Sequence, residues 1–473
     1  MYNEKITGYC IKIPYNPPEK YPELPFIMET NKNNMVYPMI RNLLIKLRLD
    51  ESNIGCREWN PFKDIVKPGN RVLIKPNLVL HRHYLGEKAL HGSIVHGSVI
   101  RPLVDYVYKA LAGNGEIFIA DNPVAGADFK AIMDFTGIQE MIDCLSQYGY
   151  SAELKVIDLR PKVSVEAKNG SFFYKAQAGD PLGYVTVDLG KNSLFAEFDN
   201  VPNVHYYTLA DQAVDHLDPK CSRLSTTDKY HNSNSHKYVV SRSILDTDVL
   251  IDLAKMKTHC KAGVSLTLKN MIGMVYLKEC IPHHRPGLPP QGDSFPDYPA
   301  PYFIHSRNLY VKLRRLIRIH RFPGFRHFRN YLQKKQILIN SYIEHGNWKG
   351  NDTIWRTILD LNRIAMYADK NGKMHDVPQR KIFYCIDGII AQQGDGPING
   401  EPFNASIVFG GSNSVFVDTL AVESMGFDPM MISSISQAYS IQKWKLINNN
   451  DVVPVIKELK LPQFNFQMSK GWE

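Results

Sequence analysis

A strand–helix–strand pattern in the first third of the chain limits the folds that this sequence is able to adopt. A short apolar run at 71–75 follows a Pro-Gly-Asn turn, and residues 99–111 carry apolar side chains at helical spacing. A second apolar run at 116–121 predicts another buried strand. Because parallel strands need a crossover connection of this kind, the pattern predicts a parallel sheet with right-handed crossovers.

Later segments extend this pattern into an α/β fold. Residues 249–253, 381–386 and 405–409 are strand-like, and a helix is predicted from 414 to 425. Residues 150–240 are more irregular and partly β. We therefore expect an α/β protein with a mostly parallel or mixed sheet, flanked by helices and interrupted by a long insertion.

The 473 residues suffice for one large domain or two ordinary ones. The early prolines mark residues 1–60 as an N-terminal extension. Residues 61–285 and 376–473 are expected to form the α/β core. Residues 286–375 are expected to form a helical, basic insertion.

Bulk composition narrows the classes of partner. The formal net charge of +9 is mild for this length, and the chain has no recognised nucleic-acid motif, which disfavours nucleic acid as the ligand. Seven scattered cysteines without a Cys-x-x-Cys pair indicate a reducing compartment and no disulfide framework. Without a signal-peptide pattern or a run of roughly 20 apolar residues, we expect a cytoplasmic protein.

Polar residues follow the first two predicted strands. Lys75 and Asn77 end the first strand, and Asp121 ends the second. Ligands of parallel sheets bind beyond the carboxyl ends of strands, where a lysine attracts phosphate or carboxylate and an asparagine orients it. Asp121 is able to pair with Lys75, orient a hydroxyl or hold a cation. In isolation, a strand-ending turn is the commoner explanation of Lys75 and Asn77, and it explains Asp121 at least as well as a ligand contact does.

A His-Gly-Ser-Ile-Val-His-Gly-Ser segment, residues 91–98, precedes the helix at 99–111. Its glycines allow close backbone approach to a ligand, and the N-terminus of a helix favours anions. His96 is thus a candidate catalytic residue. Surface histidines with an N-cap at Ser98 are the competing interpretation.

The most specific segment spans residues 255–285. Lys255, Lys257, Lys269 and Lys278 lie among Met, Ile, Val and Gly, and buried ammonium groups are costly unless an anion neutralises them. Lys257 and His259 are candidates for proton transfer or nucleophilic chemistry, since burial lowers a lysine pKa and histidine titrates near neutrality. Asn270 follows Lys269 as a further ligand contact. A solvated basic face is the alternative.

Two further patterns bear on cations. Cys260, Cys280, His283 and His284 are the alternative metal ligands, although their spacing matches no standard site. A glycine-rich loop after the strand at 381–386 offers Asp387 and Asp395 for ligand hydroxyls or a divalent cation.

Residues 308–336 are rich in arginine and lysine, with leucines at helical spacing. Such a helix is able to lie on an acidic membrane surface, which predicts possible peripheral membrane contact; a charged outer face is the commoner explanation.

Several motifs, in this order, resemble the domain of unknown function 362 family. The matching pieces are Val72-Leu73-Ile74-Lys75-Pro76-Asn77, the His96 region, Ile119-Ala120-Asp121, Lys255-Met256-Lys257-Thr258-His259, Leu268-Lys269-Asn270-Met271-Ile272-Gly273, Asp387-Gly388 with Gly394-Asp395-Gly396-Pro397, and Val417-Asp418 with Met425-Gly426. Many members resemble redox proteins with a ferredoxin-like module. This chain lacks the cysteine run, so no iron–sulfur cluster is expected. Segments 283–290 and 351–356 resemble a subgroup found near bacterial cell-surface polysaccharide genes.

These observations predict an enzyme acting on a small anionic substrate, such as a phosphorylated or nucleotide-activated sugar or a carboxylate. His259 or His96 would transfer the proton. The substrate contacts would be Lys75, Asn77, Asp121, Lys255, Lys257, Lys269, Asn270, Lys278, Asp387 and Asp395. A metal-binding or redox accessory protein, and a non-catalytic membrane-peripheral partner in envelope-glycan assembly, are the alternatives. Reaction class and oligomeric state are not predicted.

Overall fold

The computed structural model describes most of the chain. The described residues are 1–147, 150, 153–166, 172–202, 204–207, 226–287, 289–294, 346–448 and 462–473. The basic stretch 308–336 falls outside them.

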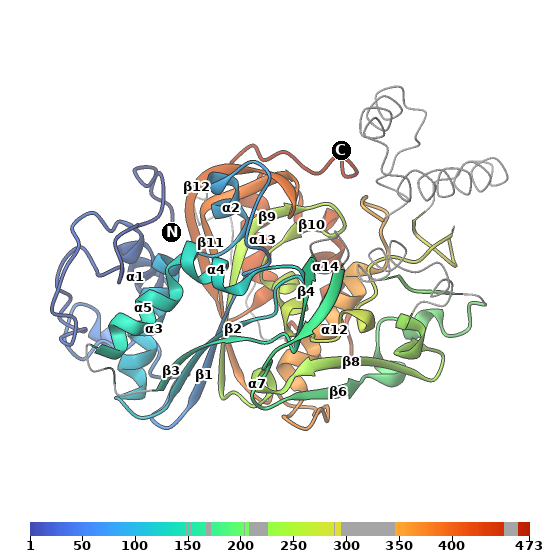
Figure 1. Cartoon of the computed structure of the whole chain (residues 1–473), viewed down its shortest axis with the longest axis horizontal. Coiled ribbons are helices and arrows are strands. Elements are labelled where there is room, and N and C mark those ends of the chain that lie inside the picture. The colour runs from blue at the N-terminus through green and yellow to red at the C-terminus, as the bar shows by residue number, and fades with distance from the viewer. Residues whose placement is uncertain are drawn as a thin grey trace.

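A seven-stranded mixed sheet forms the centre of the molecule (Figure 1). Its strand order is β12-β11-β9-β1-β2-β3, with β10 paired to β9. The strands are β1 (Arg71–Pro76), β2 (Glu116–Asp121), β3 (Glu153–Asp158), β9 (Val249–His259), β10 (Gly263–Ser265), β11 (Lys381–Asp395) and β12 (Asn399–Gly411). Neighbours from β11 through β9, β1 and β2 to β3 run parallel, while β12 and β10 are antiparallel to their partners. This confirms the predicted α/β fold.

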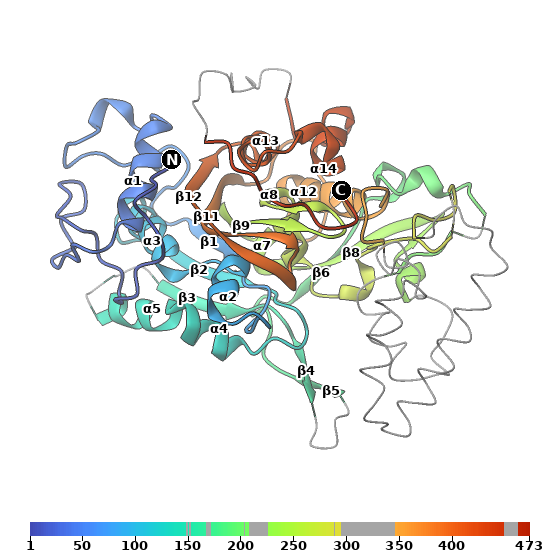
Figure 2. The same ribbon diagram turned by 90° about the horizontal axis from the view of Figure 1, so that it is seen from above.

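Helices cover both faces of this sheet (Figures 1 and 2). Val72 and Ile74 of β1 point into one apolar cluster and Leu73 into the other, as the alternation of a strand requires. The first cluster includes α1 (Val36–Lys46), α3 (Gly97–Leu111), α4 (Phe129–Thr136) and α5 (Ile138–Gln147). The second includes α8 (Thr267–Asn270), α12 (Ile354–Tyr367), α13 (Ser414–Ser424) and α14 (Ser433–Ser436).

Smaller β elements extend from this core. The hairpin of β4 (Lys162–Glu166) and β5 (Phe172–Ala176) projects away from the sheet (Figure 2). A separate antiparallel sheet has the order β6-β8-β7, with β6 at Tyr184–Asp188, β7 at His231–Asn232 and β8 at Ser235–Ser241. A short helix, α7 (Arg242–Leu245), links β8 to β9.

Packing joins the outer segments to the core more closely than their sequence suggests. Tyr15 and Trp59, from the expected N-terminal extension, are buried in the first apolar cluster. Helix α12 lies within the expected insertion 286–375, yet Ile358 and Leu361 are fully buried in the second cluster. In the described part of the chain, no helix combines the length and apolarity that a bilayer crossing requires.

Candidate functional site

The carboxyl ends of β1 and β9 carry a chain of hydrogen-bonded side chains. Nζ of Lys257 donates to Oδ1 of Asn77 over 2.8 Å, and Nδ2 of Asn77 donates to Oδ1 of Asn270 over 3.0 Å. Nζ of Lys75 donates to the same oxygen of Asn270 over 3.3 Å. The fold therefore gathers residues from separate sequence motifs at one edge of the sheet.

An ion pair between Lys75 and Asp121 lies at the centre of this group. Nζ of Lys75 is 2.8 Å from Oδ1 of Asp121, and both side chains are almost completely buried. The other carboxylate oxygen accepts a hydrogen bond of 2.7 Å from the backbone N–H of Leu78. Gly273, in the 3₁₀ turn Met271–Met274, lies so close to the pair that a Cβ there would overlap Nζ of Lys75. The glycine of the Leu-Lys-Asn-Met-Ile-Gly motif is thus required by close approach.

Lys257 is buried without a carboxylate partner among the described residues. Lys257 is only 1% exposed. Its Nζ donates hydrogen bonds to Oδ1 of Asn77 and to the carbonyl of Ser93, the latter at 2.7 Å. Burial, followed by the charges of Lys269 and Lys255, holds the pKa of Lys257 well below its usual value of 10.5. Burial thus favours the neutral amine of Lys257, and a negative charge at this position would stabilise the ammonium form.

Three more lysines surround this centre. Burial lowers the pKa values of Lys261, Lys269 and Lys278 to about 8. Nζ of Lys278 reaches the carbonyls of Val275 and Asn122 at 3.2 and 3.4 Å, which are uncharged acceptors. Lys269 has no hydrogen-bond acceptor within the described residues, and part of its side chain reaches the surface.

Two histidines lie in the same basic environment. Nδ1 of His259 accepts from the backbone N–H groups of Lys261 and Ala262 at 3.0 and 3.3 Å, so the neutral ring carries its hydrogen on Nε2. Nδ1 of His283 lies 2.8 Å from the carbonyl of Ile281, to which it donates, leaving Nε2 as an acceptor. Burial and neighbouring lysines lower the pKa of His259 well below 6.5 and that of His283 to about 3.

Lys255 and His96 belong to a second group, beside the first. Nζ of Lys255 is 2.9 Å from Oδ2 of Asp387, and the hydroxyl of Tyr9 bonds both carboxylate oxygens at 2.9 Å. The His96 ring stacks on Tyr9 at 4.5 Å, and burial lowers its pKa well below 6.5. His91 lies in the last turn of helix α2 (Glu87–Ser93), so the segment expected to precede α3 begins in a helix. Lys255 and Asp387 chiefly neutralise each other.

The prediction that Asp387 and Asp395 lie in a glycine-rich loop is wrong, because both residues belong to a strand. Strand β11 continues through both residues, paired with β12 and interrupted by a register shift between Gly388 and Ile390. Asp387 therefore lies inside the sheet, whereas Asp395 ends the strand and accepts the backbone N–H of Lys470 at 3.0 Å. Within the part of the chain that the structure describes, these two carboxylates share no hydrogen-bond or ion-pair partner.

Two further buried carboxyl groups lie near Lys75. Asp252 is the partner of Lys75 on the neighbouring strand β9, so both side chains are on the same face of the sheet. Oδ1 of Asp252 accepts from Nδ2 of Asn270 at 2.5 Å, and its Oδ2 has no partner. Asp418 accepts from the backbone N–H groups of Thr267 and Leu268 at 2.9 Å. Burial raises the pKa of Asp252 well above its usual value and that of Asp418 to about 7. Burial thus opposes the charged form of Asp252, whereas the neighbouring charge of Lys75 favours it.

The alternative metal ligands are not gathered into a site. Sγ of Cys280 contacts the N–H of Val239 and the carbonyl of Leu277, and the His284 ring stacks on Tyr207 at 5.7 Å. Across the described ranges, no group of three or more His, Cys, Asp or Glu side chains is arranged to hold a metal ion. Cys260, Cys280, His283 and His284 thus lack the geometry of a metal centre.

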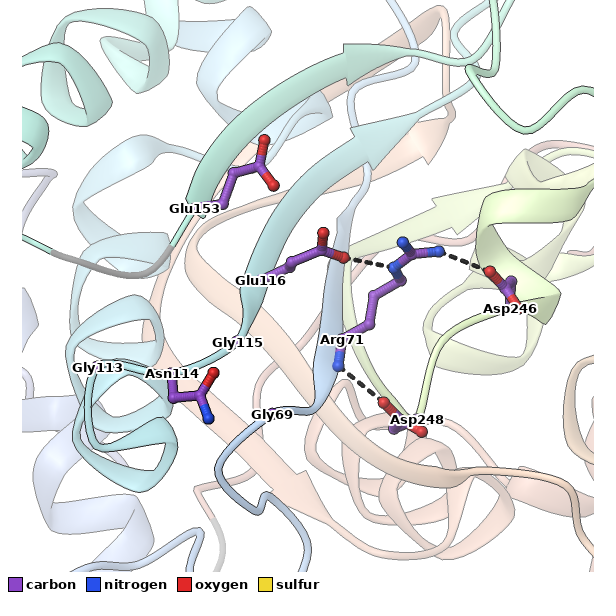
Figure 3. Close-up of a pocket in the computed structure, with 9 residues that line it drawn as sticks. All are labelled: Gly69, Arg71, Gly113, Asn114, Gly115, Glu116, Glu153, Asp246 and Asp248. Carbon is purple, nitrogen blue, oxygen red and sulfur yellow. Dashed lines mark hydrogen bonds and ion pairs between the residues drawn. The ribbon is translucent and has the colours of Figure 1, made fainter.

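An open pocket of about 670 Å³ lies at the other edge of the sheet (Figure 3). Arg71, Glu116 and Glu153 are the first residues of β1, β2 and β3, so the pocket faces the amino ends of the strands. Arg71 pairs with Glu116 and Asp246, both at 2.6 Å, but the lining also holds Glu153 and Asp248 and is acidic overall, which does not suit an anionic ligand. This pocket is remote from the lysines and from the edge at which parallel sheets bind ligands.

Sequence reasoning missed several contributors to the site. Lys261 lies two residues after the Lys-x-Lys-Thr-His motif, in the turn between β9 and β10, and its charge acts on His259. Tyr9 is 378 positions from Asp387, so no local pattern connects them. Asp252 was read only as part of a buried strand, although a carboxylate inside an apolar run is itself a sign of function.

Comparison with known proteins places the chain in a family. No curated protein matches the chain. A family model, described as a domain of unknown function (DUF362), matches residues 72–187 and 203–423, which include the strands and motifs that carry the lysines. The chain therefore belongs to the domain of unknown function 362 family.

Proposed function

We propose that this protein is an enzyme that binds a small anionic substrate at the lysine cluster, defined as Lys75, Lys257, Lys261, Lys269 and Lys278. The observation that carries the proposal is the buried ammonium of Lys257, whose acceptors are uncharged. Burying such a charge unpaired is costly, and a phosphate or carboxylate group would offset that cost. Lys75 is better balanced, because Asp121 is its ion-pair partner.

Asn77 and Asn270 would fix the orientation of the lysines rather than supply charge. Each amide bridges two neighbours, so Lys257 and Lys75 are held in place before the substrate arrives. Such preorganisation is what a site needs to stabilise charge that develops during a reaction. Lys255, Asp387 and Asp395 have partners in the protein, so their proposed contribution is to support the site.

His259 is the stronger candidate for proton transfer. Burial is the largest cause of the lowered pKa of His259, and the charges of Lys269, Lys257 and Lys261 lower it further. A bound anion would offset the contribution of the lysines and raise the pKa of the ring. Substrate binding would thus activate the histidine. His96 stacks on Tyr9 beside the Lys255–Asp387 pair, which suits a supporting role.

The biological setting is proposed from sequence resemblance alone. Segments 283–290 and 351–356 favour a role in bacterial cell-surface polysaccharide metabolism, for which the substrate would be a phosphorylated or nucleotide-activated sugar in the cytoplasm.

Two measurements test this proposal. Thermal unfolding of the full chain should shift to higher temperature with millimolar inorganic phosphate, because a ligand bound only by the folded state stabilises it. The shift should vanish in Lys257→Ala and persist in Lys130→Ala, a matched control whose exposed side chain pairs with Asp134. Mass spectrometry of sugar phosphates and nucleotide sugars incubated with the protein should reveal a converted compound.

Conversion should be lost in His259→Ala and Lys257→Ala while both variants remain folded. Equal thermal shifts in Lys257→Ala and Lys130→Ala would place anion binding elsewhere on the protein. Undiminished conversion by both active-site variants would end the catalytic assignment.

A further inference from the structure

The lysine cluster contains more positive charge than one carboxylate group is able to balance. Its five ammonium groups face Asp121, which bonds Lys75, and Asp293, whose charge acts on Lys261. Asp293 is already engaged with Arg285, whose Nε lies 3.8 Å from its Oδ2. Asp252 is a further carboxyl group beside Lys75. Within the described residues, the ammonium groups of Lys257, Lys269 and Lys278 contact no carboxylate, which leaves a surplus of about three positive charges when these lysines are ionised.

The geometry shows that these groups form one electrostatic unit. Asn77 and Asn270 connect Nζ of Lys257 to Nζ of Lys75 through hydrogen bonds of 2.8, 3.0 and 3.3 Å, and the charge of Lys75 also acts on Lys269 and Lys278. Lys278 lies near the same ion pair, since its acceptor Asn122 directly follows Asp121, the last residue of β2. A ligand that reaches Lys75 would therefore meet positive charge on several sides.

The inner and outer lysines differ in exposure. Lys75 and Lys257 are 0% and 1% exposed, while Lys269 and Lys278 are partly exposed. The cluster thus runs from a buried end toward the surface, which suits an anionic group that is drawn inward and held at more than one point.

We infer that the ligand of this site carries at least two negative charges on one compact group, as a phosphate monoester or a diphosphate does, and is not a simple carboxylate. This inference rests on the proposed anion site and narrows its substrate class. A carboxylate would leave most of the surplus unbalanced, whereas a diphosphate spans several lysines and offsets nearly all of it. Lysine is well suited to such a ligand, because its ammonium acts as a point charge on phosphate.

A matched series of probes tests the role of charge. Calorimetric titrations of the full chain would use methanesulfonate, sulfate and diphosphate at constant ionic strength. Methanesulfonate and sulfate are similar in shape and differ by one charge. We expect sulfate to bind at least about tenfold more tightly than methanesulfonate, equivalent to roughly 1.4 kcal/mol, and diphosphate to bind more tightly still.

Variants locate the effect. Lys269→Gln and Lys278→Gln should each reduce the preference for sulfate over methanesulfonate several-fold, while Lys130→Gln should leave it unchanged. Equal binding of methanesulfonate and sulfate would overturn the multivalent-anion inference and leave the proposed anion site standing. Failure of all three probes to bind would instead remove the proposed function. A sulfate preference unaffected by both cluster variants would also overturn the inference.

Discussion

Lys75 and Asp121 form an ion pair 2.8 Å long at the ends of adjacent parallel strands, and both side chains are sealed from solvent. Each member of the pair also makes a hydrogen bond to a third residue. The ammonium also bonds Asn270, and the carboxylate also accepts the N–H of Leu78. The pair therefore fixes β1, β2 and the helical turn after β10 relative to one another, and the other lysines are arranged around it.

Gly273→Ala tests that arrangement. The added Cβ would overlap Nζ of Lys75 and lie 2.5 Å from Oδ1 of Asp121, so the pair would have to move. We expect a loss of about 1–3 kcal/mol in the free energy of unfolding, as for other overpacked sites, together with weaker phosphate binding. Urea unfolding monitored by circular dichroism measures the first effect, and calorimetry the second.

Gly126→Ala is the matched control, because a Cβ at Gly126 meets nothing within 4 Å. Its stability should differ from that of the original protein by less than about 0.5 kcal/mol. If both alanine variants behaved alike, Gly273 would not be held by close approach to the ion pair.

The strands and helices that sequence analysis predicted well are those with a regular apolar pattern. Residues 71–75, 99–111 and 116–121 were expected as strand, helix and strand, and the structure has β1, α3 and β2 there. Local periodicity sufficed because each element buries a continuous apolar face. The ends of parallel strands then predicted that Lys75 and Asp121 would lie at one edge.

The rest depended on tertiary contacts. Strand β9 extends to His259, although its lysines give the segment a polar appearance, because one face of the strand meets α2 and the other meets the second apolar cluster. Strand β11 passes through Gly388, where an added Cβ would overlap the side chains of Met256 and Ile407. Glycine there reflects close packing between strands, which a sequence pattern does not distinguish from a loop.

Replacing Lys257 by methionine should stabilise the ligand-free protein. Burial depresses the pKa of Lys257 below the unfolded value of 10.5, so ionisation of this lysine opposes folding at neutral pH. Methionine removes that cost but leaves Asn77 Oδ1 and the Ser93 carbonyl without their donor. We expect a net gain of about 1–2 kcal/mol at pH 7, measured by chemical denaturation.

The sign of the pH dependence provides the control. Below the folded-state pKa of Lys257 the gain should be complete, and it should disappear as the pH rises toward 10.5, where the unfolded chain also loses the proton. Lys130→Met should show neither the gain nor its pH dependence. A destabilised Lys257→Met at pH 7 would mean that the ammonium is well compensated inside the protein.

Asp387→Asn should behave as a structural variant. Both members of its ion pair with Lys255 are fully buried, and breaking such a pair typically costs about 3–5 kcal/mol because one charge is left uncompensated. Adding Lys255→Met to Asp387→Asn should recover part of this loss. The surface variant Asp134→Asn, which also breaks a lysine pair, should change stability by less than about 1 kcal/mol. Loss of phosphate binding by Asp387→Asn without loss of stability would instead make Asp387 a ligand contact.

Anion affinity should decline above about pH 8. Burial lowers the pKa values of Lys261, Lys269 and Lys278 to about 8 in the free protein, and a bound anion would raise them. The complex therefore keeps protons that the free protein loses as the pH rises through 8, so binding takes up protons in that range. Each lysine should weaken the affinity by up to about tenfold per pH unit above 8, with little change below it. Calorimetric titration with sulfate, whose own charge is constant from pH 6 to 10, measures the trend, and repeating it in buffers of different ionisation enthalpy counts the protons taken up. A flat profile through pH 9 would mean that these lysines keep their usual pKa values, and affinity that rises with pH would contradict a site built on their positive charge.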